Sequence, residues 1–209
     1  MAKVAVTGYD GFIGTHLVRA LLAAGHVVYP MDPEWGYEPK EVDRIYHLAC
    51  PSASSTIVGD PIGVMNTIMD VTRNAMSICP KALFINVSSI GATQLDVDEY
   101  GQKAYNIAKR CMEVYLEHSG IDYINYRLPS VYGEDMRNDN LIKRCAEGRA
   151  TPPQDPDRMY FIGHIDDVVE SLVNLLPIDI EQITLGQIYE QFNSGRRGLY
   201  RPEPSQDSA

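Results

Sequence analysis

The chain has 209 residues, of which 44% are hydrophobic and 22% are charged, a composition typical of a folded globular protein. At about 100 to 200 residues per domain, this length fits one domain with a small appendage and excludes two large domains. The net charge of -10 opposes attraction to nucleic-acid polymers and to anionic membranes, so we expect neither as a partner.

Neither a targeting segment nor a metal site is indicated. The N-terminus runs directly into a strand-like segment, and no apolar stretch approaches the roughly 20 residues needed to span a bilayer. We therefore expect a cytoplasmic protein. The four cysteines are isolated from one another and the five histidines lack the spacing of metal ligands, so we expect neither disulfides nor a bound metal.

Five short apolar runs rich in β-branched residues alternate with longer segments of helical period. These runs predict strands at residues 3–7, 27–31, 44–49, 83–88 and 123–128. The alternation is typical of βαβ units, and it predicts an α/β fold with a Rossmann-like, doubly wound parallel sheet.

Apolar side chains recur every three or four residues within residues 65–79 and again within 104–115. Such stripes predict two one-faced helices, whose apolar faces serve core packing or dimer packing. After the fifth strand, residues 140–147 and 166–176 look helical around a breaker-rich loop at 151–156. We expect one domain over 1–192 with a small, truncated substrate lobe at about 134–192, and a flexible tail at 193–209.

Three glycines follow the first predicted strand in a G-x-x-G-x-x-G pattern: Gly8, Gly11 and Gly14. Glycines at a strand-to-helix turn let backbone N–H groups approach a pyrophosphate, although they also make purely structural turns. Asp32 ends the second strand, where a carboxylate can accept hydrogen bonds from a ribose 2'-hydroxyl and repel a 2'-phosphate. This position favours NAD over NADP, the alternative being a turn residue ahead of Pro33.

Tyr105 and Lys109 lie one helical turn apart in the second one-faced helix. A lysine cation lowers the pKa of a nearby phenol, which makes Tyr105 a candidate proton acceptor. The fourth strand ends in Ser88 and Ser89 at the sheet edge where doubly wound folds bind ligands. A hydroxyl there can orient the substrate oxygen that the tyrosine deprotonates, or it can simply cap a turn.

In chain order, these motifs and the segment 127–133 resemble the extended short-chain dehydrogenase/reductase family, which acts on sugar nucleotides. Residues 41–54 are most similar to the UDP-glucuronate decarboxylases of that family, and residues 60–62 and 66–68 continue the similarity.

The resemblance implies bound NAD, a UDP-sugar substrate and a homodimer formed through the two one-faced helices. It implies that Tyr105, Lys109 and Ser88 are catalytic, with Tyr105 taking the proton of the sugar 4-hydroxyl. The implied cofactor-binding residues are Gly8, Gly11, Phe12, Ile13, Gly14, Asp32, Leu48, Ala49, Ser52, Lys109, Pro129 and Val131. Oxidation at C4 of a glucuronate leaves the carboxylate β to a ketone, so carbon dioxide can leave before hydride returns.

Several positions depart from the decarboxylase pattern. Ile90 stands where the decarboxylases carry a glutamate, and Asp98 and Glu99 are the carboxylates that could replace it. About a dozen residues separate Asp32 from the third strand, which leaves no room for the usual extra strand and helix. Arg158 is out of register with the family's arginine, and Arg196 and Arg197 could contact a diphosphate or be solvated.

Three functions therefore remain open. The leading hypothesis is an NAD-dependent enzyme that oxidises C4 of a nucleotide sugar, most similar to UDP-glucuronate decarboxylase. A 4-epimerase and a 4,6-dehydratase are alternatives, because Ile90 replaces the glutamate. From another class, the alternative is a protein without catalysis: either a non-catalytic dinucleotide-binding protein or a purely structural Rossmann-like adaptor that binds no NAD.

Overall fold

The computed structural model describes residues 1–31, 41–52, 54–96, 100–195 and 197–199. The chain divides into two compact units. The first unit contains residues 1–129 and 169–178, and the second contains residues 130–168 and those from 179 onward. The helix α6 (Ile165–Asn174) passes from the second unit into the first.

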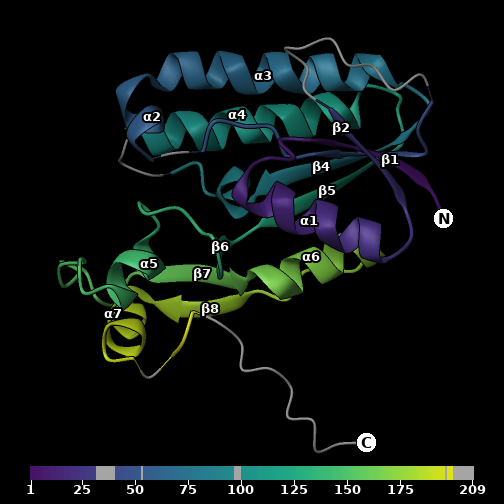
Figure 1. Ribbon diagram of the computed structural model, residues 1–209. Coiled ribbons are helices and arrows are strands. Elements are labelled where there is room, and N and C mark those ends of the chain that lie inside the picture. The colour runs from purple at the N-terminus through teal and green to yellow at the C-terminus, as the bar shows by residue number, and fades with distance from the viewer. Residues whose placement is uncertain (32–40, 53, 97–99, 196, 200–209) are drawn as a thin grey trace, which may run out of the picture. The chain divides into compact units, whose positions relative to one another are not determined.

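A five-stranded parallel sheet forms the centre of the first unit (Figure 1). Its strands are β1 (Lys3–Thr7), β2 (Val27–Met31), β3 (Arg44–His47), β4 (Leu83–Ser89) and β5 (Tyr123–Leu128). They lie in the order β2-β1-β3-β4-β5, with every neighbouring pair parallel. The α/β fold with a Rossmann-like parallel sheet is confirmed, and this order is one of the two common doubly wound orders.

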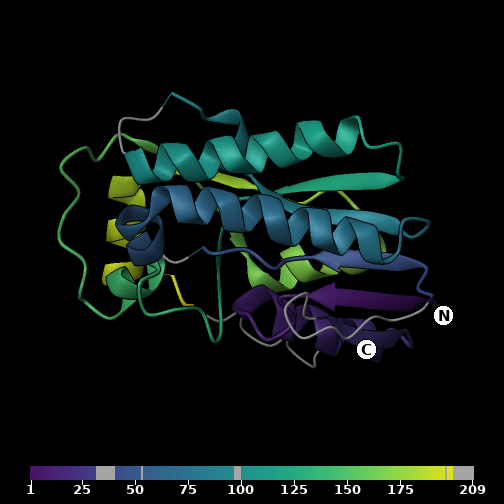
Figure 2. The same ribbon diagram turned by 90° about the horizontal axis from the view of Figure 1, so that it is seen from above.

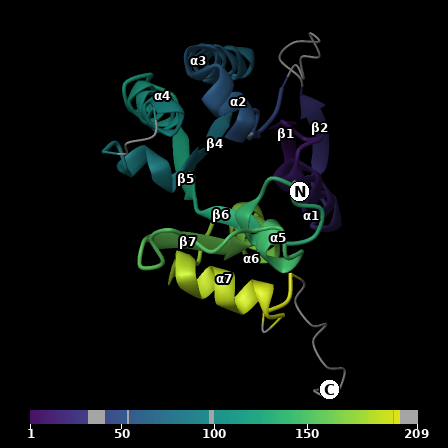
Figure 3. The same ribbon diagram turned by 90° about the vertical axis from the view of Figure 1, so that its left-hand side faces the viewer.

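Helices cover both faces of this sheet. The helix α1 (Phe12–Ala23) contacts β1 and β2 on one face, while α3 (Pro61–Ile78) and α4 (Tyr100–Glu117) cover the other (Figure 3). Figure 2 shows α3 and α4 running side by side. The short α2 (Ser54–Gly59) precedes α3, and the 3-10 helix η1 (Ile90–Thr93) follows β4.

The main core lies between the sheet and the α3–α4 layer. Ile45 and Phe84 point from the sheet into a cluster that contains Ala75 and Met76 of α3 and Leu116 of α4. Burial of such side chains contributes about 1.5–3 kcal/mol each. The start of α3 is fixed by Asp60, whose carboxylate accepts a hydrogen bond from the Gly63 amide at 2.9 Å.

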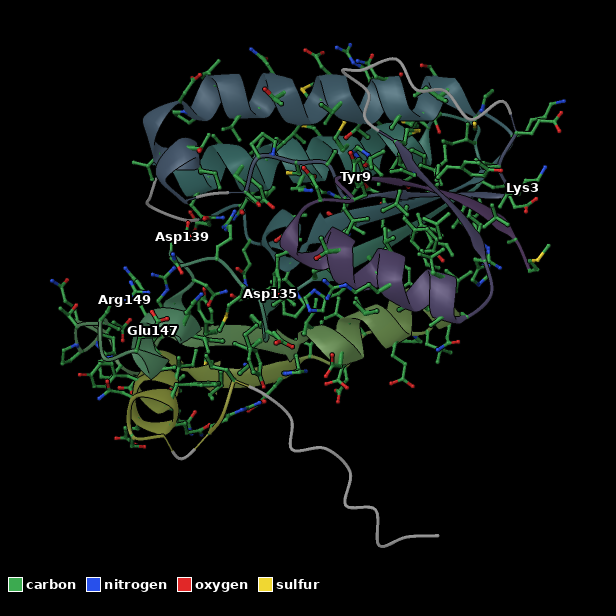
Figure 4. All side chains as sticks on the ribbon, viewed as in Figure 1. Lys3, Tyr9, Asp135, Asp139, Glu147 and Arg149 are labelled. Atoms are coloured by element: carbon green, nitrogen blue, oxygen red, sulfur yellow. The ribbon has the colours of Figure 1, made fainter. Side chains whose placement is uncertain are left out.

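A three-stranded sheet forms the centre of the second unit. It contains β6 (Ser130–Tyr132), β7 (Met159–His164) and β8 (Glu181–Thr184), with β6 and β7 parallel and β7 and β8 antiparallel. The helices α5 (Leu141–Ala146) and α7 (Leu185–Asn193) accompany it. Glu147 and Arg149, which follow α5, form an ion pair (Figure 4).

The segment after α7 is held by one arginine. Arg197 donates to both carboxylate oxygens of Glu181 at 2.7 and 2.6 Å and to the Tyr132 hydroxyl at 2.6 Å. Its guanidinium also lies over the rings of Tyr132 and Phe192. Of the two arginines considered for a diphosphate, Arg197 is thus paired inside its own unit, and Arg196 lies outside the described residues.

The helices in the described part of the chain include none that is long and apolar enough to cross a membrane.

Candidate functional site

The polar and glycine-rich segments of the first unit gather where β1 and β3 end. These strands are neighbours in the sheet, yet the chain leaves β1 into α1 on one face and leaves β3 toward α2 and α3 on the other. Divergence of this kind opens a crevice at the carboxyl ends of the two strands, which is the usual ligand site of doubly wound sheets.

The turn between β1 and α1 leaves no room for side chains at two of its glycines. Gly8 has φ +63°, and a Cβ placed there would lie 2.8 Å from the Ala49 amide nitrogen. A Cβ at Gly14 would lie 2.1 Å from the Gly8 carbonyl oxygen. The glycine turn therefore contacts the backbone of residues 48 and 49 directly, at a distance that only glycine permits.

The N-terminus of α1 opens beside this turn. Gly11 is the residue that precedes the first helical turn, and it offers no side-chain cap to the amides of Phe12 and Ile13. Uncapped helix amides next to closely approaching glycines suit the negative charge of a pyrophosphate. Tyr9, on the same turn, is exposed (Figure 4). This arrangement fits the diphosphate of a dinucleotide.

Several of the other predicted cofactor-binding residues follow strands of the first sheet at this edge. Leu48 and Ala49 directly follow β3, and Ser52 lies exposed a few residues beyond. Pro129 follows β5 at the same edge, whereas Val131 is buried in β6 of the second unit. Asp32, the predicted ribose ligand, and the carboxylates Asp98 and Glu99 lie outside the described residues.

The helix α4 brings Tyr105 and Lys109 together. The Lys109 ammonium lies 5.9 Å from the centroid of the Tyr105 ring and donates to the Val87 carbonyl of β4 at 3.0 Å. Burial alone would lower the pKa of Lys109, but the neighbouring Cys50 and Tyr105 side chains outweigh it, so this pKa is raised. Lys109 is therefore a fixed, buried cation beside the phenol.

Ser88 belongs to an ionic cluster around the buried carboxylate of Glu113, which the sequence did not predict. Its hydroxyl donates to a Glu113 carboxylate oxygen at 2.7 Å, and Arg127 binds both oxygens of that carboxylate at 2.9 and 2.7 Å. Burial alone would raise the pKa of Glu113, but hydrogen bonds from Arg127, Ser88 and Arg110 outweigh it and lower this pKa. Glu113 is therefore a carboxylate anion that accepts the hydrogen bond donated by Ser88.

Ser89 is placed differently. Successive residues of a strand point to opposite faces, so the side chain of Ser89 points away from the face on which Ser88 meets α4. Ser89 is half-buried and its oxygen accepts from the Gly91 amide at 3.1 Å. Within the described residues, the Ser89 hydroxyl accepts this one hydrogen bond and donates none, so its proton is available to a ligand.

A buried polar row crosses the sheet at the same level. The strand register pairs Thr7 with His47, His47 with Asn86, and Asn86 with Asn125. The four residues are far apart along the chain, so no local motif predicts this row. The signal that could have found it is one polar residue near the carboxyl end of every predicted strand except the second.

The sequence matches the NAD dependent epimerase/dehydratase family over residues 36–183. It is 25% identical over 228 residues to UDP-glucuronic acid decarboxylase 6 of Arabidopsis thaliana, covering 85% of this chain and 66% of that one. Across the curated relatives with which it was matched, the chain spans 52% to 67% of their length.

Solved structures show the same fold. The UDP-glucuronic acid 4-epimerase of Bacillus cereus, in complex with UDP-glucuronic acid and NAD, superposes with a TM-score of 0.74 at 19% identity, covering 95% of this chain and 85% of that one. The NAD-dependent NDP-hexosamine 5,6-dehydratase TunA also gives 0.74, at 20% identity, covering 98% and 85%. With its matched segment and this fold, the chain belongs to the NAD dependent epimerase/dehydratase family.

Proposed function

We propose that this protein binds NAD at the carboxyl edge of the first sheet and oxidises C4 of a UDP-sugar, with UDP-glucuronate decarboxylation as the overall reaction. The observation that carries the proposal is the fixed Lys109 cation beside Tyr105 on α4, because folding alone does not require this pair. The similarity to UDP-glucuronic acid decarboxylases supports the choice of substrate.

The glycine turn and the α1 N-terminus would hold the diphosphate of NAD. Leu48, Ala49 and Ser52 would lie along the cofactor, and Lys109 would bind its nicotinamide ribose. NAD supplies an acceptor for the hydride of C4 and returns that hydride at the end of the reaction. Asp32 and Pro129 complete the cofactor contacts that we propose for the first unit.

Tyr105 would act as the base that removes the proton of the sugar 4-hydroxyl. The neighbouring Lys109 ammonium would stabilise the negatively charged phenolate, because attraction between opposite charges is stronger in a buried site than in water. The 4-ketone so formed stabilises the carbanion that remains at C5 when the carboxylate leaves as carbon dioxide. A proton then reaches C5 before C4 is reduced again.

Two hydroxyl groups could orient the 4-oxygen. Ser88 is the predicted one, but its proton is donated to Glu113. A hydroxyl that donates elsewhere can only accept from the sugar, whereas Ser89 can donate to the oxygen of the ketone. Ser89 has the available proton, whereas Ser88 lies on the face of β4 that meets the helix of Tyr105, so substitution of each serine decides between them.

Turnover of UDP-glucuronate in D₂O tests the reaction. Decarboxylation predicts a pentose product that has lost the carboxyl group and gained one solvent deuterium at C5. An epimerase would return a product of unchanged mass and inverted C4, and a protein that only binds NAD would return the substrate itself. Either of those results would contradict the decarboxylase proposal.

A further inference from the structure

Thr7 and His47 belong to the polar row that crosses the buried layer of the first sheet. They are directly paired in neighbouring strands β1 and β3, and their exposed fractions are 0% and 3%. Polar side chains in such a layer destabilise the fold unless every donor and acceptor is satisfied. Their hydrogen-bond partners are therefore informative about what they do.

A chain of hydrogen bonds runs from α3 to the end of β3. The amides of Leu48 and Ala49 donate to Thr7 Oγ1 at 3.1 and 3.0 Å. Thr7 Oγ1 and His47 Nδ1 are 2.9 Å apart, and His47 Nε2 and Thr72 Oγ1 are 3.0 Å apart. Thr72 in turn donates to the Ile68 carbonyl of α3 at 2.7 Å.

Counting protons fixes the direction of each bond. Thr7 Oγ1 accepts from two amides, so its single proton can go only to His47 Nδ1. The Thr72 proton goes to Ile68, so Thr72 accepts from His47 Nε2–H. His47 is therefore the neutral tautomer protonated at Nε2, and each of these groups has a partner.

The last group in this series of hydrogen bonds, the Ala49 amide, lies against the glycine turn. The Ala49 amide that Thr7 holds is the group that a Cβ on Gly8 would approach to 2.8 Å. The backbone of residues 48 and 49 is thus fixed from two sides, by the Thr7 hydroxyl and by the surface of the turn. A shift of the Thr7 hydroxyl or of the glycine turn would therefore move the backbone of residues 48 and 49 at the carboxyl edge of the sheet.

We propose that Thr72, His47 and Thr7 form a positioning relay that holds the Leu48–Ala49 backbone against the glycine turn and thereby sets the affinity for NAD. The ligand named here rests on the proposed function, whereas the relay itself rests on the hydrogen bonds. None of the three side chains is assigned a contact with the substrate, so they are positioning residues.

Two substitutions of His47 separate its two hydrogen bonds. The Asn side chain in His47→Asn places an oxygen where Nδ1 accepts from Thr7, and the Gln side chain in His47→Gln places an amide where Nε2 donates to Thr72. Loss of one hydrogen bond allows a change of up to about tenfold. We expect the Kd for NAD, measured by calorimetry, to rise by about tenfold in His47→Gln and Thr7→Val and by less than about threefold in His47→Asn.

The helix α3 offers a matched control for the far end of the relay. Thr67 and Thr72 both donate to the carbonyl four residues earlier. Of the two, only Thr72 also accepts a hydrogen bond from His47. In ¹⁵N spectra, Thr72→Val should shift the His47 ring nitrogens, and Thr67→Val should leave them unchanged. Equal spectra for both variants would contradict the relay.

Amide exchange distinguishes failure of the relay from failure of the proposed function. In Thr7→Val, the amide of Ala49 should exchange about tenfold faster without any ligand, whereas the amide of Leu48 keeps the Thr7 carbonyl oxygen as an acceptor at 3.3 Å. Unchanged exchange, or a wild-type His47 protonated at Nδ1, would overturn the relay. Wild-type protein with the expected tautomer and exchange but no NAD binding would instead overturn the proposed function and the role of the relay in it.

Discussion

At the residue scale, two adjacent serines differ in what their hydroxyl groups can do. Ser88 donates its proton to a carboxylate that also binds Arg127, whereas Ser89 accepts from a backbone amide and keeps its proton. A hydroxyl that stabilises an alkoxide or a ketone must donate to it. The two hydroxyl groups therefore differ in what they can donate to a ligand at the end of one strand.

Alanine substitution of each serine tests this separation. We expect Ser89→Ala to lower kcat by about 100-fold, the effect of losing one donor to a developing oxyanion. Ser88→Ala should lower the free energy of unfolding by about 1–3 kcal/mol, because the buried Glu113 loses a hydrogen bond. A larger loss of kcat in Ser88→Ala than in Ser89→Ala would instead support Ser88 as the catalytic hydroxyl.

His47 makes stability depend on pH. Burial, and then the nearby Lys109 cation, lower its pKa from 6.5 to about 3. The unfolded chain therefore binds a proton at His47 between pH 6.5 and 3 while the native state does not. The free energy of unfolding must fall as the pH falls through this window, by about 1.4 kcal/mol per pH unit at most.

Urea unfolding of wild type and His47→Asn at pH 7, 6 and 5 measures this dependence. Wild type should lose on the order of 1–2 kcal/mol over this range, and His47→Asn should lose less, because Asn does not titrate. Glu113 is a second group with a lowered pKa, but its loss of stability falls below this range. Equal pH slopes for the two proteins would contradict a neutral, buried His47.

Local motifs predicted part of the site. The spacing of Tyr105 and Lys109 placed both on one face of a helix, and the glycines marked the turn. The bonds from Thr7 to His47 and from Glu113 to Arg127 join residues 40 and 14 positions apart. Such pairs depend on strand register and helix packing, which a single sequence does not specify.

At the element scale, α3 and α4 pack on each other as well as on the sheet. Ile68 of α3 and Met112 of α4 are almost fully buried in one apolar cluster with Ala108. The apolar stripes that predicted these helices therefore serve the core of the chain itself. The outward face of α4 carries the exposed side chains of Val114 and Tyr115.

Two side-chain truncations on α4 compare how much its buried face and its exposed face contribute to stability. Met112→Ala removes a buried side chain and should lower the free energy of unfolding by about 2–5 kcal/mol. Val114→Ala, two residues away and 38% exposed, should change it by about 0.5 kcal/mol or less. Equal losses in urea unfolding would contradict the packing described for α4.

The sequence predicted the first five strands better than the last three. Buried β-branched runs predicted β1 to β5, with β3 ending at His47 and not at residue 49, and β4 extending to Ser89. The strands β6 and β8 contain only three and four residues. Pairing with β7 gives these two segments their extended form.

At the scale of the whole molecule, we propose a homodimer that uses the outward face of α4. Cys111, Val114 and Tyr115 form an exposed stripe at helical spacing on this helix. Sedimentation velocity at micromolar concentration should give about twice the 23.3 kDa chain mass, and Tyr115→Glu should reduce that species. A single species at the chain mass in wild type would contradict the dimer.

A mass spectrum of UDP-glucuronate after incubation with NAD and either wild type or Tyr105→Phe tests whether Tyr105 supports decarboxylation. We expect loss of the carboxyl mass with wild type and a rate lower by about 100- to 10,000-fold with the variant, which lacks the phenolic base. Unchanged UDP-glucuronate with wild type, or equal turnover by both proteins, would contradict this expectation.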